Sequence, residues 1–340
     1  MNKNSIIIED VTGVVDKVDL SELSNQTVLI VGGTGLIGTY FIYSIIEAAK
    51  RGIVPKKLSI THLNALPEYL DSIKEYSWIE LLTGDLTDDG FVATIGKYDY
   101  ILHLAGYGQP AQFAVDPIKT IKLNTSLTIQ LLERLNPNGK FLFASSSGIY
   151  NGLVKDSYTE EDVGTTNTLH PRACYYEGKK CGEVIVNGYR KRGINAKSVR
   201  LSYTYGPGVR LSDERALYSF IKKGMTGKIN MLDDGTAQRI YCYVADALEL
   251  MWKIMLFGDR EIYNVGGLEV TTIFEVASII ATELESEVVV PSVNNSVPGN
   301  HMVERLDMTR TLGQFPISYT SLKLGIKRTI DWYKSNYYLK

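Results

Sequence analysis

The sequence predicts an α/β fold, in which helices cover both faces of a doubly wound parallel sheet and a smaller C-terminal domain follows. Two observations predict the sheet. Short apolar, β-branched runs alternate with helical patterns over residues 26–205, and a glycine-rich turn joins the first run to the first long helix. A third observation predicts the smaller domain, because the elements after Gly206 are shorter and are broken by Pro291, Pro298 and Pro316.

The composition is that of a globular protein with enough apolar residues for a large core. Of 340 residues, 44% are hydrophobic and 22% are charged, and the net charge of −2 provides no basic field for nucleic acid or an anionic membrane. No apolar run reaches the length of a membrane span, and the N-terminus lacks a signal-peptide pattern. Cys174, Cys181 and Cys242 lack metal-ligand spacing. We therefore expect a cytoplasmic protein with reduced thiols and no metal.

The first strand, turn and helix occupy residues 27–50 and carry Gly32, Gly35 and Gly38 at a spacing of three. Gly32 permits a tight turn, Gly35 lets the backbone approach a phosphate, and Gly38 lets the helix pack close to the strand. The helix N-terminus offers unpaired N–H groups and a partial positive charge to a pyrophosphate. The segment predicts a Rossmann dinucleotide site, with a plain glycine-rich turn as the alternative.

The region before this turn, residues 1–25, is predicted to be an extension packed on the outside of the domain. Within it, Ser5–Glu9 is expected to form an edge strand, and residues 11–23 mix apolar and acidic side chains. Its function cannot be inferred from the pattern.

Four further runs, at residues 57–61, 78–82, 100–104 and 141–144, are predicted strands of the same sheet. The end of the run at 57–61 bears on the cofactor, because an acid there binds ribose hydroxyls and a nearby arginine favours a 2′-phosphate. Residues 61–64 contain neither. NAD is preferred because no arginine follows, and NADP is not excluded.

Several residues beyond these strands are candidates for ligand contact. Ala105 and Gly106 are small enough for a ligand to pass close to the backbone. Asp85 can meet an adenine amino group or can instead cap a helix. His103 lies in an apolar run, so a hydrogen-bonded core histidine is expected. The helical pattern over 118–135 contains Asn124, expected to bridge backbone under the active site.

Tyr175 and Lys179 are four residues apart on a helix predicted to run to about Arg192, so they share one face. The positive charge of Lys179 would lower the pKa of the phenol from about 10 towards neutrality and make it a general base. Ser146, at a strand end, can hydrogen-bond the same substrate oxygen. Beside a nicotinamide, Tyr175 would take a hydroxyl proton while the hydride leaves for the cofactor. Tyr176/Lys180, or an incidental pair on a solvated helix face, are the other interpretations.

The sequence resembles the extended short-chain dehydrogenase/reductases of the nucleotide-sugar epimerase/dehydratase group over roughly residues 26–335. Residues 171–179 are most similar to UDP-glucuronate decarboxylases, and this likeness selects the Tyr175/Lys179 register. Further matching segments are residues 200–208, 212–215, 233–239, 243–246 and 263–267. The resemblance implies a tightly held NAD, a nucleotide diphosphate-sugar substrate and a homodimer formed through a four-helix bundle.

This resemblance divides the chain into the extension (1–25), an NAD-binding Rossmann domain (26–205, with the return of about 240–260) and a mainly substrate-binding domain (206–340). The expected cofactor-binding residues are Gly32, Gly35, Leu36, Ile37, Asp85, Leu86, Leu104, Ala105, Gly106, Asn124, Tyr175 and Lys179. The expected substrate-binding residues are Ser147, Arg215, Arg239 and Tyr203. The arginines suit a diphosphate because a guanidinium forks onto two oxygens, although either can instead be a surface arginine. Tyr203 stands where relatives often place an asparagine.

The departure from the family after Ser146 bears on the reaction. Dehydratases of the group read Thr-Asp-Glu there and decarboxylases read Thr-Ser-Glu, whereas this chain reads Ser146-Ser147-Gly148. The acid that would drive elimination or assist decarboxylation is missing, and epimerisation at C4 needs no such acid.

We therefore expect an NAD(P)-dependent nucleotide-sugar epimerase, in which Tyr175, Lys179 and Ser146 oxidise the sugar at C4. Under the same hypothesis, the product can instead be a stable keto sugar. The alternatives are a UDP-glucuronate decarboxylase that recruits another acid, a 4,6-dehydratase, or a non-catalytic sensor or scaffold that binds NAD or a nucleotide.

Overall fold

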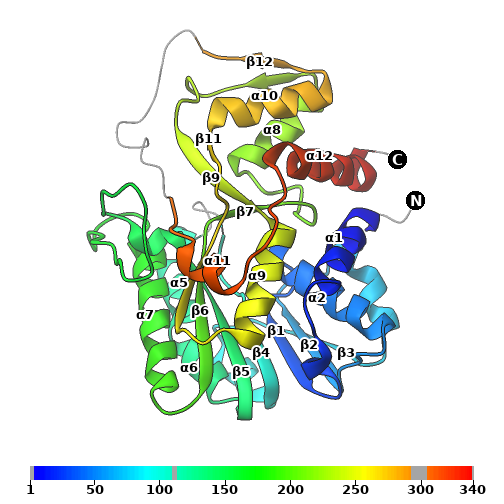
Figure 1. The fold of residues 1–340 in the computed structure, drawn as a ribbon, viewed down its shortest axis with the longest axis vertical. Coiled ribbons are helices and arrows are strands. Elements are labelled where there is room, and N and C mark those ends of the chain that lie inside the picture. Colours follow the sequence, from blue (N-terminus) through cyan, green and yellow to red (C-terminus); the bar gives the residue numbers. More distant parts are fainter. Residues whose placement is uncertain (1–3, 109–112, 292–304, 339–340) are drawn as a thin grey trace.

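The computed structural model describes residues 4–108, 113–291 and 305–338, so Pro298 lies outside the described residues. Within these ranges, seven strands form one sheet in the order β10-β6-β5-β4-β1-β2-β3, and every neighbouring pair is parallel. The predicted doubly wound sheet is confirmed (Figure 1). Its strands are β1 (Thr27–Val31), β2 (Lys57–His62), β3 (Ile79–Thr83), β4 (Tyr98–His103), β5 (Leu135–Ser146), β6 (Asn195–Leu201) and β10 (Ile262–Val265).

Both faces of the sheet are buried, which explains why its central strand β1 is almost continuously apolar. In β1, Val28 and Ile30 enter one core, whereas Leu29 and Val31 enter the other. The helices that build these layers are α2 (Leu36–Lys50) and α9 (Val244–Phe257) on the first side, and α3 (Asp89–Thr94), α5 (Pro117–Asn124), α6 (Ser126–Leu132) and α7 (Ala173–Arg190) on the other. The helix expected over 118–135 is thus two helices that meet at Thr125.

The edge strand expected at Ser5–Glu9 is wrong, because these residues begin helix α1 (Ser5–Val15). Ile7, Val11 and Val14 recur at helical spacing and are buried against α2 and α9. Short apolar runs do not distinguish a strand from a helix, and here the buried face settled the choice. No described helix has the length and apolar character needed to cross a membrane.

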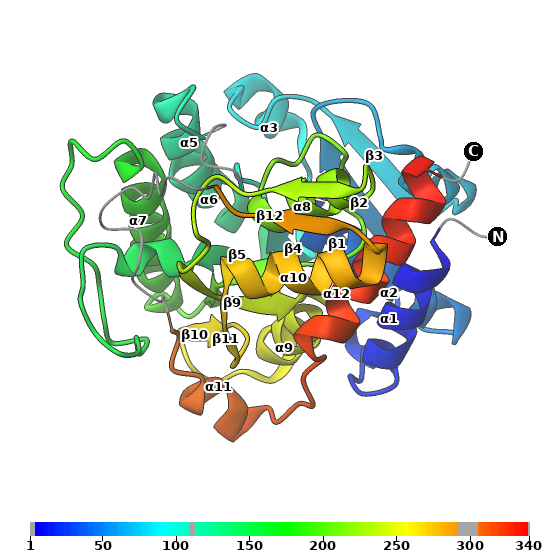
Figure 2. The same ribbon diagram turned by 90° about the horizontal axis from the view of Figure 1, so that it is seen from above.

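The smaller region contains two small sheets and three helices among the described residues. Its strands are β7 (Tyr203–Tyr205), β8 (Lys228–Asn230), β9 (Gln238–Tyr243), β11 (Val270–Thr272) and β12 (Glu287–Val289). Its helices are α8 (Ala216–Gly224), α10 (Ile273–Leu284) and α12 (Leu322–Tyr333), whereas α11 (Thr309–Gln314) packs against β10 of the large sheet. Only Ser202 separates β6 from β7, so the carboxyl edge of the large sheet faces this region (Figures 1 and 2).

The short helices are η1 (Ser21–Leu23), η2 (Glu68–Glu75), η3 (Ser147–Tyr150) and the π-helix η4 (Lys334–Tyr338). Residues after Gly206 contribute to both parts of the molecule. Helix α9 covers the large sheet, and β10 joins the sheet beside β6, which the sequence did not indicate.

Candidate active site

The candidate site lies where β1, β4 and β5 end side by side. The parallel register pairs Val31 with His103, and His103 with Phe143. The glycine turn, the loop of residues 104–106 and Ser146 therefore share the carboxyl edge of the sheet, where open α/β sheets bind their ligands. Lys179 reaches this edge from α7, since a Cβ built on Gly106 would lie 3.5 Å from its Nζ.

The glycine turn forms a cradle that side chains would fill. Gly32 has φ of +86°, and a Cβ there would lie 2.8 Å from the backbone of Ala105. A Cβ on Gly38 would lie 2.7 Å from the carbonyl oxygen of Gly32. Gly35 is the N-cap of α2 and makes no side-chain cap, which leaves the first-turn N–H groups of that helix to a ligand. This cradle fits the pyrophosphate of a dinucleotide.

Lys179 is buried at the base of the site. Its Nζ donates a hydrogen bond to the Ala144 carbonyl oxygen (2.6 Å) and lies 5.9 Å from the centre of the Tyr175 ring. Burial lowers the pKa of Lys179 to about 7, and the Glu183 carboxylate one turn along α7 opposes this shift. Tyr175 in turn stacks on Phe113, with ring centres 4.7 Å apart. The structure thus brings the predicted tyrosine and lysine together at the end of β5.

The other register does not reach this edge. Lys180 donates to the Gly164 carbonyl oxygen and to Glu177, both at 2.8 Å. Tyr176 packs instead against the turn after β5, where Ser146 Oγ accepts a hydrogen bond from the Gly148 N–H (3.0 Å). Ser147 follows Ser146 and is buried in η3. Of the two possible pairs, Tyr175/Lys179 is therefore the one placed beside the cradle.

Two further residues singled out in the sequence, Asp85 and His103, have defined surroundings. Although burial opposes it, hydrogen bonds from Lys119 (2.6 Å) and Thr87 hold the pKa of Asp85 below its usual value. The N-cap of α3 is Asp88, so the alternative role of Asp85 as that cap is wrong. His103 is fully buried and its Nε2–H donates to the Leu123 carbonyl oxygen (3.0 Å), as expected for a core histidine. Burial, and then the Lys179 charge, lower the pKa of His103 to about 3.

Asn124 lies beneath α7, where a Cβ on Gly178 would approach its side chain to 3.5 Å. Its Nδ2 donates to the Thr120 carbonyl oxygen (2.8 Å), so the side chain bonds backbone, but within its own helix. Its buried Oδ1 has no partner among the described residues. Leu36, Ile37, Leu86 and Leu104 are partly buried.

The predicted substrate-binding arginines gather around Tyr241 on β9. The Arg239 guanidinium lies 5.7 Å from the centre of the Tyr203 ring. The Arg215 guanidinium donates hydrogen bonds to both carboxylate oxygens of Asp213, at 2.8–3.1 Å. Burial raises the pKa of Tyr241 to about 12, against the positive charges of Arg239 and Arg215. The structure therefore brings these arginines and Tyr203 to one place, with the Arg215 fork already occupied by a carboxylate.

A buried ion pair behind the site was not indicated by the sequence. Arg200 on β6 binds both Glu183 carboxylate oxygens, and Glu183 also accepts from Ser145, the neighbour of Ser146. Arg200 further donates to the Tyr150 hydroxyl (2.9 Å) and the Glu160 carbonyl oxygen (2.9 Å).

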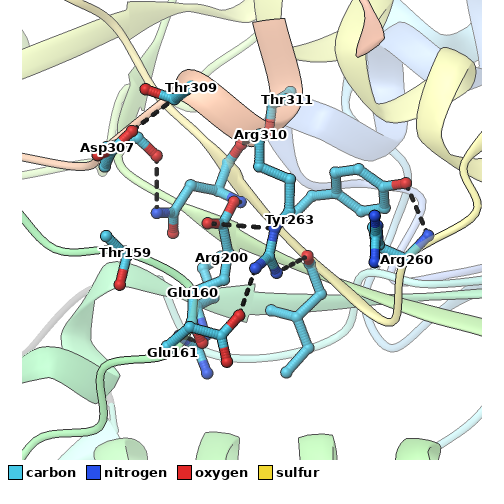
Figure 3. Close-up of polar contacts among 12 residues, drawn as sticks. Thr159, Glu160, Glu161, Arg200, Arg260, Tyr263, Asp307, Thr309, Arg310 and Thr311 are labelled. Atoms are coloured by element: carbon cyan, nitrogen blue, oxygen red, sulfur yellow. Dashed lines mark hydrogen bonds and ion pairs between the residues drawn. The ribbon is translucent and has the colours of Figure 1, made fainter. Parts of the chain in front are cut away.

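Figure 3 shows the outer part of this network. There Arg310 lies beside Glu160 and Glu161, and the Thr309 N–H donates to Asp307. No local sequence pattern marks these residues, since β6 also contains Lys197 and Ser198.

The parallel sheet and the glycine cradle at the end of β1 are features of dinucleotide-binding α/β proteins. The chain belongs to the NAD dependent epimerase/dehydratase family, whose sequence profile matches residues 28–266. It is 29% identical to UDP-glucuronic acid decarboxylase 6 of Arabidopsis thaliana over 281 residues, which is 80% of this chain and 78% of the relative.

Solved structures share the fold. An epimerase from Methanothermobacter thermautotrophicus superposes with a TM-score of 0.79 at 19% identity, covering 99% of this chain and 97% of the other. UDP-N-acetylglucosamine 4-epimerase from Methanobrevibacter ruminantium superposes with a TM-score of 0.77 at 20% identity, covering 92% and 99%. These likenesses establish the architecture, and the family establishes NAD as the cofactor.

Proposed function

We propose that the protein is a nucleotide-sugar 4-epimerase. The observation that carries this proposal is the combination of a buried lysine beside Tyr175 with a glycine, Gly148, where an acid would be needed for elimination. Bound NAD supplies the hydride acceptor and donor. Tyr175 takes the C4 hydroxyl proton and later returns it to the keto oxygen, while Lys179 provides positive charge beside the phenolate. Ser146 holds the same oxygen.

The remaining predicted residues complete this proposal. The glycine cradle and residues 104–106 would hold the dinucleotide, and Asp85 would meet its adenine. Arg239, Arg215, Tyr203 and Ser147 would hold the nucleotide diphosphate and the sugar. For Arg215 this requires the diphosphate to share or displace Asp213, because that carboxylate occupies the guanidinium fork in the structure.

Decarboxylation of UDP-glucuronate is the second candidate, and the similarity to decarboxylases favours it. An isotope experiment separates the two reactions. The protein with added NAD is incubated in D₂O with UDP-glucose, UDP-N-acetylglucosamine and UDP-glucuronate. An epimerase returns the original hydride, so its 4-epimer contains no solvent deuterium at C4. A decarboxylase releases CO₂ and takes up solvent deuterium at C5.

Tyr175→Phe tests the catalytic assignment. We expect turnover to fall by roughly 10²–10⁴-fold, the usual contribution of a positioned general base. Tyr189→Phe is the matched control, because Tyr189 lies on the same helix and its hydroxyl donates a hydrogen bond to Glu133. Release of CO₂ by the unmodified enzyme without epimer formation would favour the second candidate, and full activity of Tyr175→Phe would refute both.

We also propose that α5 and α7 form a homodimer interface. The two helices pack together (Figure 2). Ile118 and Val184 on them are 65% and 69% exposed, although both are apolar. Light scattering should show a dimer that Val184→Glu converts to a monomer. Leu232→Glu, at an exposed leucine in the smaller region, should leave the mass unchanged. A monomeric unmodified chain would refute the interface.

A further inference from the structure

The space beside Gly148 is already filled by an aromatic ring. A Cβ built on Gly148 would lie 2.6 Å from Cε1 and 2.7 Å from Cδ1 of Tyr176, closer than Cβ contacts occur in proteins. On its other side, the same atom would lie 3.3 Å from Ser146 Oγ. Position 148 therefore does more than lack an acidic side chain. No side chain fits there while Tyr176 is in place.

Tyr176 is fixed in this position by its surroundings. It lies in the first turn of α7, directly after Tyr175, and only 7% of the residue is exposed. Its ring is edge-on to Tyr175, with centres 6.0 Å apart, and is 5.8 Å from the ring of His170. A ring packed in this way cannot swing aside as a flexible side chain would.

We propose that Tyr176 is a specificity-determining residue, which closes the position from which an acid would act on the oxidised sugar. This inference rests on the proposed C4 oxidation. A 4-keto sugar has two ways forward: loss of a group at C5 or C6, which a neighbouring acid promotes, or return of the hydride to C4 with return of the proton from Tyr175. With the aromatic ring of Tyr176 against Gly148, the first path lacks its acid and the second remains.

Three variants test this steric exclusion. Gly148→Glu alone should lower the melting temperature and the activity. Gly148→Glu with Tyr176→Ala should recover both, because removing the ring opens the space. Gly148→Glu with Tyr176→Phe keeps the ring and should not recover. Gly96→Glu, at an exposed glycine with no atom near its Cβ position, controls for the added charge.

The product of the recovered variant tests specificity, a property that a purely structural role would not change. We expect Gly148→Glu/Tyr176→Ala to divert the keto sugar, so that CO₂ from UDP-glucuronate or dehydrated sugar from UDP-glucose rises by roughly 10²-fold relative to the epimer. If Gly148→Glu alone is as stable and active as the unmodified chain, or if the alanine and phenylalanine double variants behave alike, the inference is wrong. Absence of any epimer from the unmodified enzyme would instead refute the proposed function, and the melting temperatures would still test the exclusion.

Discussion

Replacing Arg200 with methionine should destabilise the protein severely, because it leaves a carboxylate buried without a counter-charge. The Arg200 and Glu183 side chains are 2% and 6% exposed, and Nε and Nη2 of the arginine bind the carboxylate at 3.0 and 2.8 Å. Removing one member of a buried pair costs about 3–5 kcal/mol. The hydrogen bonds from Arg200 to Tyr150 and to backbone oxygens are lost as well, which places the expected cost at the upper end of this range.

A double-mutant cycle separates the charge effect from the loss of packing. Glu183→Leu removes the buried carboxylate, so Arg200→Met/Glu183→Leu leaves no uncompensated charge between the two positions. We expect the double variant to be at least about 2 kcal/mol more stable than the sum of the single variants predicts. Urea unfolding with saturating NAD in every sample, followed by tryptophan fluorescence, measures each corner. Additive effects, or a cost below about 1 kcal/mol for Arg200→Met, would refute this account.

The same pair should influence the chemistry through Lys179. The Glu183 carboxylate opposes the burial that lowers the pKa of Lys179 to about 7. Glu183→Gln removes this opposition, so the pKa of Lys179 should fall further, and the lysine charge should be lost at lower pH. The pH profile of kcat should shift to the acid side, whereas a purely structural loss would reduce kcat equally at every pH.

Three further predictions concern the burial of Lys179, the glycine cradle and helix α1. Between pH 7 and 10.5 the unfolded chain binds a proton at Lys179 that the folded chain does not, so stability should rise with pH by about 1.4 kcal/mol per unit. Lys179→Met should reduce this slope in unfolding curves at pH 7 and 9, leaving the part due to Lys197, whose pKa burial lowers to about 8. An unchanged slope would contradict the burial argument. Gly38→Ala should abolish retention of NAD, measured by absorbance after denaturation, since its Cβ would meet backbone at 2.7 Å. Gly13→Ala, a helical glycine with free space around it, should retain NAD and gain about 1 kcal/mol of stability. Asp10→Asn should speed amide exchange in α1, because Asp10 pairs with Arg328 at 2.8 Å, and unchanged exchange would show that apolar packing alone holds this helix.

The sequence predicts those parts of the molecule that depend on neighbours along the chain. The glycine turn, the strands and the Tyr175/Lys179 spacing are local patterns, and the structure places them as expected at one sheet edge. The sequence does not predict contacts between distant segments. The Arg200–Glu183 pair joins a strand to a helix, and Tyr176 meets Gly148 across a turn. Such pairs depend on how the helices pack on the assembled sheet, so no local periodicity marks them.

The N-terminal helix shows how a segment without a recognisable motif can bear on the site. Asp10 accepts hydrogen bonds from Tyr40 on α2 (2.7 Å) and Tyr243 on β9 (2.6 Å), and pairs with Arg328 on α12. Helix α2 begins at the glycine cradle, and β9 carries Arg239, the proposed diphosphate ligand. One buried carboxylate thus ties the proposed cofactor-binding part to the proposed substrate-binding part. Because the proposed hydride transfer would require both ligands at a fixed separation, we expect α1 to support catalysis by holding these two parts together.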